Sequence, residues 1–163
     1  MSTLVITYIG ALERIKGADL LLRAFSKART EQDCVLWIVG DGSYKTHLLK
    51  LVRLLRTQDK VFLTGMMTQE EIGWIYLESD IIALTPRWAE PFSRVMLEGL
   101  FFGKPILATN VGGNSDGVID GVNGFLTTQN VDDISTKLRI MIRNKRLRRK
   151  MSKQSLRIYN DLV

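Results

Sequence analysis

The sequence predicts a doubly wound α/β fold, in which helices cover both faces of a sheet of about six mainly parallel strands. Short continuous apolar runs alternate with segments of helical periodicity along the whole chain. Uninterrupted apolar runs suit strands that are covered on both faces, as in a parallel sheet. The order strand then helix repeats five times, which favours right-handed crossovers and a three-layer, Rossmann-like arrangement.

Six apolar runs are expected to form the strands: residues 3–10, 34–40, 60–65, 80–86, 105–110 and a short run at 124–128. Helical periodicity marks residues 17–29, 43–56, 68–79, 91–103 and 131–144, followed by a last basic helix. No internal repeat or low-complexity linker interrupts this order. One domain over residues 1–163 is therefore expected.

Size and composition are those of a globular domain. With 163 residues and 45% hydrophobic content, the chain can bury one substantial core. No apolar run has the length of a membrane span, and "MSTLVITYIG" lacks the basic start and cleavage site of a signal peptide. A cytoplasmic protein is expected. The single cysteine, Cys34, excludes an internal disulfide and is expected to pack at the start of a strand.

Positive charge is concentrated near the end of the chain. Residues 134–163 hold ten Lys or Arg and one Asp, a net charge of +9, so the remainder carries −3 of the total of +6. This segment could contact an anionic membrane surface, or it could be a solvated helical face with Ile140, Leu147, Met151 and Ile158 turned inward. Nucleic acid is disfavoured, because no aromatic residues alternate with the charges as a base-stacking surface requires.

Glycines follow the predicted strands, at the edge of the sheet where ligands of doubly wound folds bind. They are Gly10, Gly40, Gly42, Gly65, Gly112 and Gly113. Glycine lets backbone amides approach an anion, and a following helix N-terminus favours negative charge. A phosphate-bearing ligand is the leading hypothesis, although each glycine alone can be an ordinary turn residue.

Two glutamates in "PRWAEPFSRVMLEGLFFGKPILAT", Glu90 and Glu98, are separated by seven residues. Pro91 favours the first helical position, which places Glu90 at the helix cap or just outside it and Glu98 about two turns inside. The carboxylates would then lie roughly 10–12 Å apart along the axis, about the span from sugar to ribose in a sugar nucleotide.

Carboxylates accept hydrogen bonds from vicinal hydroxyls, so Glu98 fits a ribose and Glu90 fits a transferred sugar. A diphosphate between them needs a cation, and Lys16, in the first strand-to-helix loop, is the candidate. The structural alternative makes Glu90 a favourable charge at a helix start and Glu98 a surface residue.

Four segments of the sequence resemble the C-terminal, donor-binding domain of the retaining family-four (group 1) glycosyltransferases of GT-B fold. They are "YIGALERIKGADLLLRAF", "LWIVGDGSYKTHL", "VFLTGMMTQEEI" and "EPFSRVMLEGLFFGKPILATNVGGNSDGVIDGVNGFL". The resemblance covers nearly the whole chain and occurs in the family's order. It implies the C-terminal half of a GT-B architecture.

The resemblance also implies a nucleotide-sugar donor and assigns residues to it. Glu90 and Lys16 are the expected catalytic residues, with Glu90 near the sugar and Lys16 on the diphosphate. Glu98 would bind the ribose. The expected donor-binding residues are Gly10, Arg14, Lys16, Gly40, Gly65, Met66, Met67, Glu90, Pro91, Phe92, Ser93, Arg94, Val95 and Glu98.

Three positions depart from the family pattern. Ala11 stands where an arginine commonly binds the diphosphate, with Arg14 near enough in sequence to substitute. Ser93 replaces the glycine usual after "EPF", and Asp116 replaces a glutamate usual after the glycine pair.

The family closes an acceptor-binding N-terminal domain over the donor domain, and its catalytic histidine comes from that domain. No such domain precedes the first predicted strand here, so the chain is expected to bind a donor weakly and to transfer nothing by itself. The implied chemistry retains anomeric configuration by front-face departure of the nucleoside diphosphate, stabilised by Lys16 and helix amides. The resemblance implies neither a cofactor nor a metal, and no cluster of His, Cys and carboxylates at a suitable spacing contradicts this.

Two alternatives remain open at this point. Another enzyme of the same fold, such as a sugar-nucleotide epimerase or a phosphorylase, would bring its own acid and base residues or a lysine for pyridoxal phosphate. A non-catalytic binding module would use its basic C-terminal helices to contact a membrane or nucleic acid. Membrane contact is also compatible with a transferase, since the resemblance implies acceptors at the cytoplasmic membrane surface.

Overall fold

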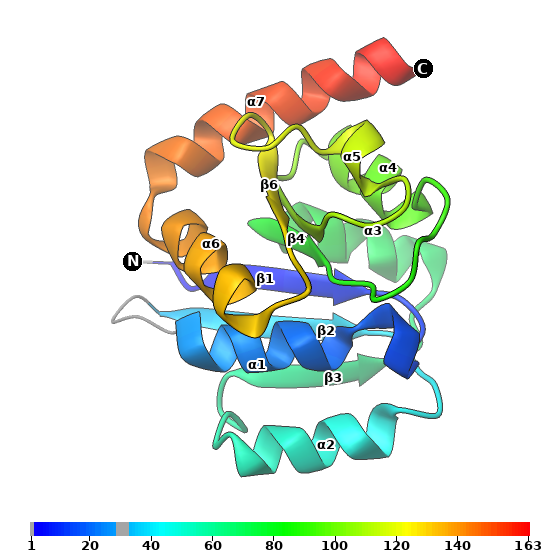
Figure 1. The fold of residues 1–163 in the computed structure, drawn as a ribbon, viewed down its shortest axis with the longest axis vertical. Coiled ribbons are helices and arrows are strands. Elements are labelled where there is room, and N and C mark those ends of the chain that lie inside the picture. Colours follow the sequence, from blue (N-terminus) through cyan, green and yellow to red (C-terminus); the bar gives the residue numbers. More distant parts are fainter. Residues whose placement is uncertain (1, 29–32) are drawn as a thin grey trace.

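The computed structural model describes residues 2–28 and 33–163. Its centre is a six-stranded sheet in the order β3-β2-β1-β4-β5-β6 (Figure 1). The strands are β1 (Leu4–Ile9), β2 (Cys34–Val39), β3 (Val61–Gly65), β4 (Ile81–Leu84), β5 (Ile106–Thr109) and β6 (Gly124–Thr127). All neighbouring pairs are parallel. This order is that of a doubly wound Rossmann-like sheet, as predicted.

Helices connect the strands in the predicted alternation. They are α1 (Ala18–Ala28), α2 (Lys45–Leu54), α3 (Gln69–Glu78), α4 (Arg94–Phe101), α5 (Asn114–Gly117), α6 (Val131–Arg143) and α7 (Lys145–Leu162). A 3₁₀ turn, η1 (Arg14–Lys16), lies between β1 and α1. Among the described residues, no helix is both long enough and apolar enough to cross a membrane.

The sheet separates two apolar layers. On one face, α1, α2 and α6 form a single buried cluster with β1 and β2. On the other face, α3 packs against β1, β2 and β4, and α4 packs against β4 and β5. β1 lies between β2 and β4, and all six of its residues are buried. Burial on both sides explains why β1 is continuously apolar, whereas the edge strand β3 leaves Phe62 exposed.

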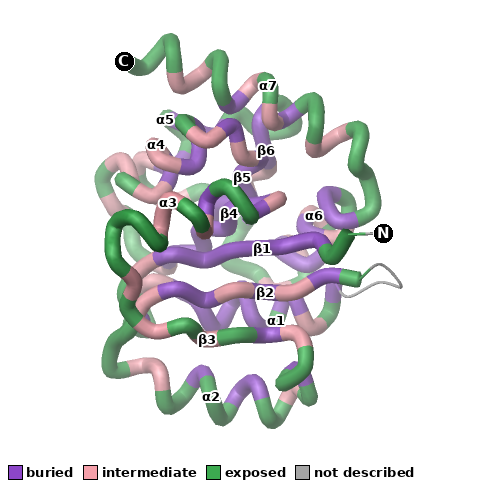
Figure 2. The backbone as a smooth tube through the Cα atoms, turned by 180° about the vertical axis from the view of Figure 1, so that it is seen from behind, coloured by how far each residue is buried: buried purple, intermediate pink, exposed green. Residues whose placement is uncertain are grey.

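The last helix, α7, crosses from one layer to the other (Figure 1). Leu147 and Met151 pack with the α1, α2 and α6 layer, whereas Ile158 and Tyr159 pack with the α4 layer. The helix is exposed along much of its remaining surface (Figure 2). The prediction that Leu147, Met151 and Ile158 turn inward is confirmed.

Several boundaries differ from the prediction. Ile140 was expected to face inward but is 44% exposed, and the neighbouring Met141 and Ile142 are buried in its place. The helix expected from residue 91 begins at Arg94. Neither α5 nor η1 was predicted. Arg29, the expected end of the first helix, lies outside the described residues. Cys34 is buried as the first residue of β2, as predicted.

Candidate functional site

A cleft opens at the carboxyl ends of β1 and β4, and it consists of two adjoining hollows. The inner hollow has a volume of about 140 Å³ and the outer one about 490 Å³. Both are lined by Lys16, Glu90, Ser93 and Val95. The position agrees with the rule that doubly wound sheets bind ligands beyond their strand ends.

An ion pair lies where the two hollows meet. The ammonium of Lys16, at the end of η1, donates a hydrogen bond to the carboxylate of Glu90, in the loop after β4. Their side chains are 33% and 22% exposed, so both remain accessible from solvent. The cleft therefore presents one cation and one carboxylate beside each other.

A second ion pair connects the segment that carries Lys16 to the loop that carries Glu90. Arg87 donates two parallel hydrogen bonds of 2.7 Å to the two carboxylate oxygens of Asp19, which is 5% exposed. Arg87 also donates to the carbonyl oxygen of Arg14 at 2.7 Å. Burial opposes ionisation of Asp19, yet the hydrogen bonds and the charge of Arg87 outweigh it and lower the pKa of the carboxyl group.

Two glycines let the backbones of these loops meet. Gly112 has φ of +53°, and a Cβ there would lie 2.1 Å from the carbonyl oxygen of Glu90. Gly17 has φ of +71°, and a Cβ would lie 1.8 Å from the carbonyl oxygen of Thr85. A side chain at either position would require the Glu90 or Lys16 loop to shift. These two glycines therefore hold the cleft in shape by packing against protein backbone.

The N-terminus of α4 faces the outer hollow. Ser93 is the N-cap, and its hydroxyl accepts a hydrogen bond of 3.4 Å from the amide of Met96. Arg94 and Val95 occupy the first two helical positions and line the hollow. Amides at such positions lack an intrahelical acceptor, and the helix dipole favours an anion near them. The serine that replaces the expected glycine thus contributes a helix cap.

Glu98 lies one turn further along α4 and does not line either hollow. Its carboxylate accepts hydrogen bonds from Tyr76 Oη at 2.9 Å and from Arg94 Nε at 2.8 Å. Tyr76 is buried, and burial together with the charge of Glu98 raises the pKa of its hydroxyl. Each carboxylate oxygen keeps further acceptor capacity, so Glu98 is held in place without being saturated.

The predicted helical position of the two glutamates is wrong. Pro91 is not the first helical residue, because Ser93 caps the helix two residues later. Glu90 therefore precedes the cap by three residues, and Glu98 is the fifth helical residue, little more than one turn inside. The axial spacing of roughly 10–12 Å assumed helix from 90 to 98 and does not apply.

The predicted site residues fall into two groups. The residues that line the cleft are Gly10, Lys16, Glu90, Pro91, Phe92, Ser93, Arg94 and Val95. The residues that do not line either hollow are Arg14, Gly40, Gly65, Met66, Met67 and Glu98.

Part of the second group gathers at the ends of β2 and β3. The amide of Gly40 donates to the carbonyl oxygen of Gly65 at 3.0 Å. Met66 is 77% exposed, whereas Met67 packs in the same apolar cluster as Tyr76 and Val95. This group is connected to the cleft through Val95, which lines both hollows.

Other cleft residues were not predicted. Tyr8, Thr85, Asn114 and Trp88 line the hollows. Burial, with the charge of Glu90 adding to it, raises the pKa of the Tyr8 hydroxyl, which donates to the carbonyl oxygen of Ala11 at 2.9 Å. Tyr8 and Thr85 could have been predicted as cleft residues, because they lie at the carboxyl ends of predicted strands. Trp88 could have been predicted as well, because it is a large apolar residue close to Glu90 in the sequence; it is 64% exposed.

In the part of the chain that the structure describes, no group of three or more His, Cys, Asp or Glu side chains is arranged to hold a metal ion. The positive charges in the cleft are those of Lys16 and Arg94.

Comparison with known proteins matches residues 2–157 to the family described as glycosyl transferases group 1. The D-inositol 3-phosphate glycosyltransferase of Nocardiopsis dassonvillei is 32% identical over an alignment of 162 residues, and the match covers 92% of this chain and 37% of that protein. The N-acetyl-alpha-D-glucosaminyl L-malate synthase of Bacillus anthracis is 31% identical over 122 residues, covering 75% of this chain and 31% of that protein.

A crystal structure of Anabaena Alr3699/HepE in complex with UDP-glucose has a TM-score of 0.90 to this chain at 25% sequence identity. The match covers 98% of this chain and 44% of that one. The same protein has also been solved with UDP. The chain spans less than half the length of the curated relatives and of this solved structure.

Proposed function

The chain belongs to the glycosyl transferases of group 1, and we propose that it binds a nucleotide-diphosphate sugar and contributes to transfer of the glycosyl group with retention. The observation that carries this proposal is the Lys16–Glu90 pair beside the N-terminus of α4, inside a cleft at the strand ends. The UDP and UDP-glucose bound by a solved relative support the choice of ligand.

In the proposed complex, the diphosphate lies against Lys16 and the first amides of α4. An anion there gains a charge-assisted hydrogen bond and the favourable end of the helix dipole. Glu90 turns from Lys16 to a hydroxyl of the sugar. Glu98 accepts from the ribose with the lone pairs that Tyr76 and Arg94 leave open. Gly65, Met66 and Met67 border the base.

The proposed reaction breaks the bond between the anomeric carbon and the diphosphate oxygen. The electron pair leaves with the diphosphate, and Lys16 with the α4 amides stabilises the charge that develops on it. The acceptor hydroxyl attacks from the face that the diphosphate leaves, and its proton passes to the departing phosphate oxygen. Configuration at the anomeric carbon is thereby retained. The proposal involves no metal and no cofactor.

Whole-protein properties belong to the same proposal. A complete transferase would place an acceptor-binding domain over the cleft, and this chain alone would bind donor without transferring sugar. A glycan, a lipid or another hydroxyl compound is the proposed acceptor class. The proposed place of action is the cytoplasm.

Isothermal titration calorimetry of the 163-residue chain tests donor binding. UDP-glucose or a GDP-sugar is expected to bind, and Glu98→Gln is expected to weaken that binding. Glu70→Gln, a change of the same type at an exposed position of α3, is the control. No binding of any nucleotide sugar at millimolar concentration would contradict the proposal.

A further inference from the structure

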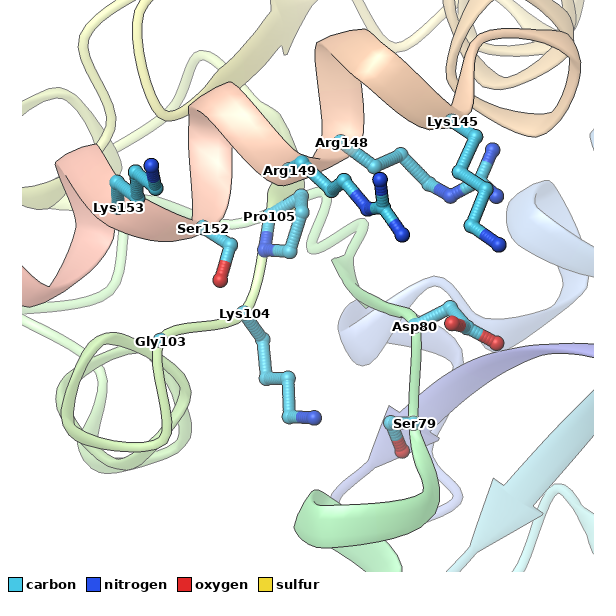
Figure 3. A pocket seen from close by; sticks show the side chains of 10 residues that line it. All are labelled: Ser79, Asp80, Gly103, Lys104, Pro105, Lys145, Arg148, Arg149, Ser152 and Lys153. Carbon is cyan, nitrogen blue, oxygen red and sulfur yellow. The ribbon is translucent and has the colours of Figure 1, made fainter.

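A second cavity lies at the opposite edge of the sheet, where β4 and β5 begin. Its volume is about 440 Å³. One wall is α7, and the other is formed by the turns directly before the two strands (Figure 3). The lining residues are Ser79, Asp80, Gly103, Lys104, Pro105, Lys145, Arg148, Arg149, Ser152 and Lys153. We call this cavity the basic pocket, since five of these ten residues are Lys or Arg and one is acidic.

The α7 wall is a regular stripe of one helix face. Residues 145, 148, 149, 152 and 153 follow the spacing i, i+3, i+4, i+7, i+8. Leu147, Met151 and Ser155, on the adjoining face, are packed or buried. In Figure 3, Lys145, Arg148 and Arg149 extend from α7 toward the turn that carries Asp80. Lys145, Arg149 and Lys153 form two like-charge i, i+4 pairs along the stripe, and an anion in the pocket would relieve their repulsion.

Two of the cations are fixed by the protein itself. Arg148 Nη1 donates to the carbonyl oxygens of Met141 and Ile142 at 2.6 and 2.7 Å, at the end of α6. Lys104 Nζ donates to the carbonyl oxygen of Leu77 at 3.0 Å. Burial lowers the pKa of both groups, and the charge of Asp80 acts in the opposite direction. An arginine has five N–H donors and a lysine three, so both retain donors for a ligand.

The other three cations, Lys145, Arg149 and Lys153, have no ion-pair or side-chain hydrogen-bond partner among the described residues. Asp80 forms no ion pair with these three cations, and its single negative charge is set against five positive ones in the pocket lining; its carboxylate accepts a hydrogen bond of 2.8 Å from the amide of Val5. The wall opposite α7 is held in place, since Ser155 Oγ donates to the carbonyl oxygen of Lys104 at 2.8 Å. The pocket therefore has a wall that the protein holds in place and a net positive charge that its own side chains do not balance.

We propose that the basic pocket binds a phosphorylated anion, with Arg149, Lys145 and Lys104 as its principal donors. Guanidinium and ammonium groups that converge on one cavity match the several acceptor oxygens of a phosphate. The phosphate comes from a soluble phosphorylated compound or from the headgroup of an anionic phospholipid. Nucleic acid fits less well, because the pocket lining contains no aromatic side chain for base stacking. The basic pocket lies at the opposite end of the strands from the donor cleft, and the proposal for it does not depend on the function proposed for that cleft.

Two double variants on the same helix provide a matched test. Lys145→Gln with Arg149→Gln removes one lysine and one arginine from the pocket. Arg146→Gln with Lys150→Gln removes the same residue types at the same spacing from exposed positions that do not line the pocket. Both proteins lose the same net charge, so general attraction to an anion falls equally. Circular dichroism checks that each variant is folded.

Two probes distinguish the sources of phosphate. Pyrophosphate is titrated into isotopically labelled protein while backbone amide resonances are followed by NMR. Co-sedimentation with vesicles of phosphatidylglycerol and phosphatidylcholine, against phosphatidylcholine alone, tests the headgroup. We expect pyrophosphate to change the chemical shifts of the backbone amides of residues 104 and 145–153. The pocket variant should bind roughly tenfold more weakly, which corresponds to about 1.4 kcal/mol. The control variant should bind within about twofold of the parent chain.

Each outcome either supports or overturns the proposal that the basic pocket binds a phosphorylated anion. Pyrophosphate binding lost only in the pocket variant supports a soluble ligand, and vesicle binding lost only in that variant supports a lipid headgroup. Equal losses in both variants would show non-specific attraction and overturn the proposal. The proposal would also be overturned if the chain bound neither pyrophosphate nor the anionic vesicles, or if it bound an oligonucleotide and neither of these probes.

Discussion

Lys16 and Glu90 are 74 residues apart in the chain, yet their side chains form an ion pair in the cleft. One follows β1 and the other follows β4, and these strands are neighbours in the sheet. In the proposed donor complex, a diphosphate has to displace the carboxylate from Lys16. Glu90 therefore opposes binding of the nucleotide alone and favours it only when a sugar hydroxyl offers a new partner.

This competition predicts opposite effects of Glu90→Gln on two ligands. Nucleoside diphosphate should bind the variant roughly 3–10-fold more tightly, because a negative charge near the phosphates is removed and Lys16 is released. The extra affinity that the sugar contributes should fall, because a strong acceptor is lost. Calorimetry with the diphosphate and with its sugar conjugate measures both changes. Weaker binding of the diphosphate alone would contradict the proposed competition.

Glu98→Gln should behave differently. If Glu98 binds the ribose, the variant loses a charge-assisted hydrogen bond that is common to both ligands. Nucleoside diphosphate and nucleotide sugar should then weaken by a similar factor of about tenfold. Differential scanning fluorimetry checks that the hydrogen bonds of Tyr76 and Arg94 to this position are not essential for folding. A loss confined to the nucleotide sugar would move Glu98 from the ribose to the sugar.

The sheet could be predicted from the sequence because a strand that is buried on both faces has a continuous apolar sequence. All six predicted strands occur, and the cleft lies at the predicted edge. The start of α4 was wrong because Pro91 and Ser93 are both acceptable near a helix start. A tertiary hydrogen bond determines which of them starts the helix. The carbonyl oxygen of Glu90 accepts a hydrogen bond of 2.8 Å from the amide of Gly113, and this contact keeps residues 90–92 outside the helix.

Side-chain contacts between distant segments could not be predicted. Arg87 and Asp19 are 68 residues apart and belong to no recognisable motif. The glycines after the strands were expected to admit a phosphate, and the sequence contains nothing to show that Gly112 faces the backbone of Glu90 instead. Charge composition located the basic helices, but only the folded chain brings Lys104 beside α7.

The Arg87–Asp19 pair predicts a pH-dependent difference in stability. Arg87→Ala leaves a buried carboxylate without its partner, which should lower the free energy of unfolding at pH 7 by about 3–5 kcal/mol. The pKa of Asp19 is lowered in the folded chain, so the pair contributes fully above about pH 4, where the carboxyl of the unfolded chain is also ionised. That contribution is lost as pH falls through the folded-state pKa.

Urea unfolding between pH 7 and pH 2.5, followed by circular dichroism, measures the effect. The parent chain and Arg87→Ala should converge in stability toward the acid end. Lys27→Ala, which removes one partner of the exposed Lys27–Asp132 pair, should cost little at any pH. A constant difference between the parent and Arg87→Ala across the range would show that the arginine acts through packing and its hydrogen bond to the carbonyl oxygen of Arg14, and not through the charge of Asp19.

Gly112 offers a test of how the loop that carries Glu90 is held. Alanine at this position meets two costs: a positive φ, about 1–2 kcal/mol, and a Cβ placed 2.1 Å from the carbonyl oxygen of Glu90. Gly121 is a matched control, because its φ is +75° but no heavy atom lies within 4 Å of a Cβ there. Gly121→Ala should therefore show the first cost alone.

Thermal and urea unfolding of both variants separate the two costs. Gly112→Ala should be less stable than Gly121→Ala by a further 1–3 kcal/mol or so, the typical cost of forcing atoms into a filled space. Because relief of the clash displaces Glu90, Gly112→Ala should also weaken nucleotide-sugar binding, whereas Gly121→Ala should not. Equal stability of the two variants would mean that the loop shifts at no energetic cost, and that Gly112 does not fix the position of Glu90 relative to Lys16.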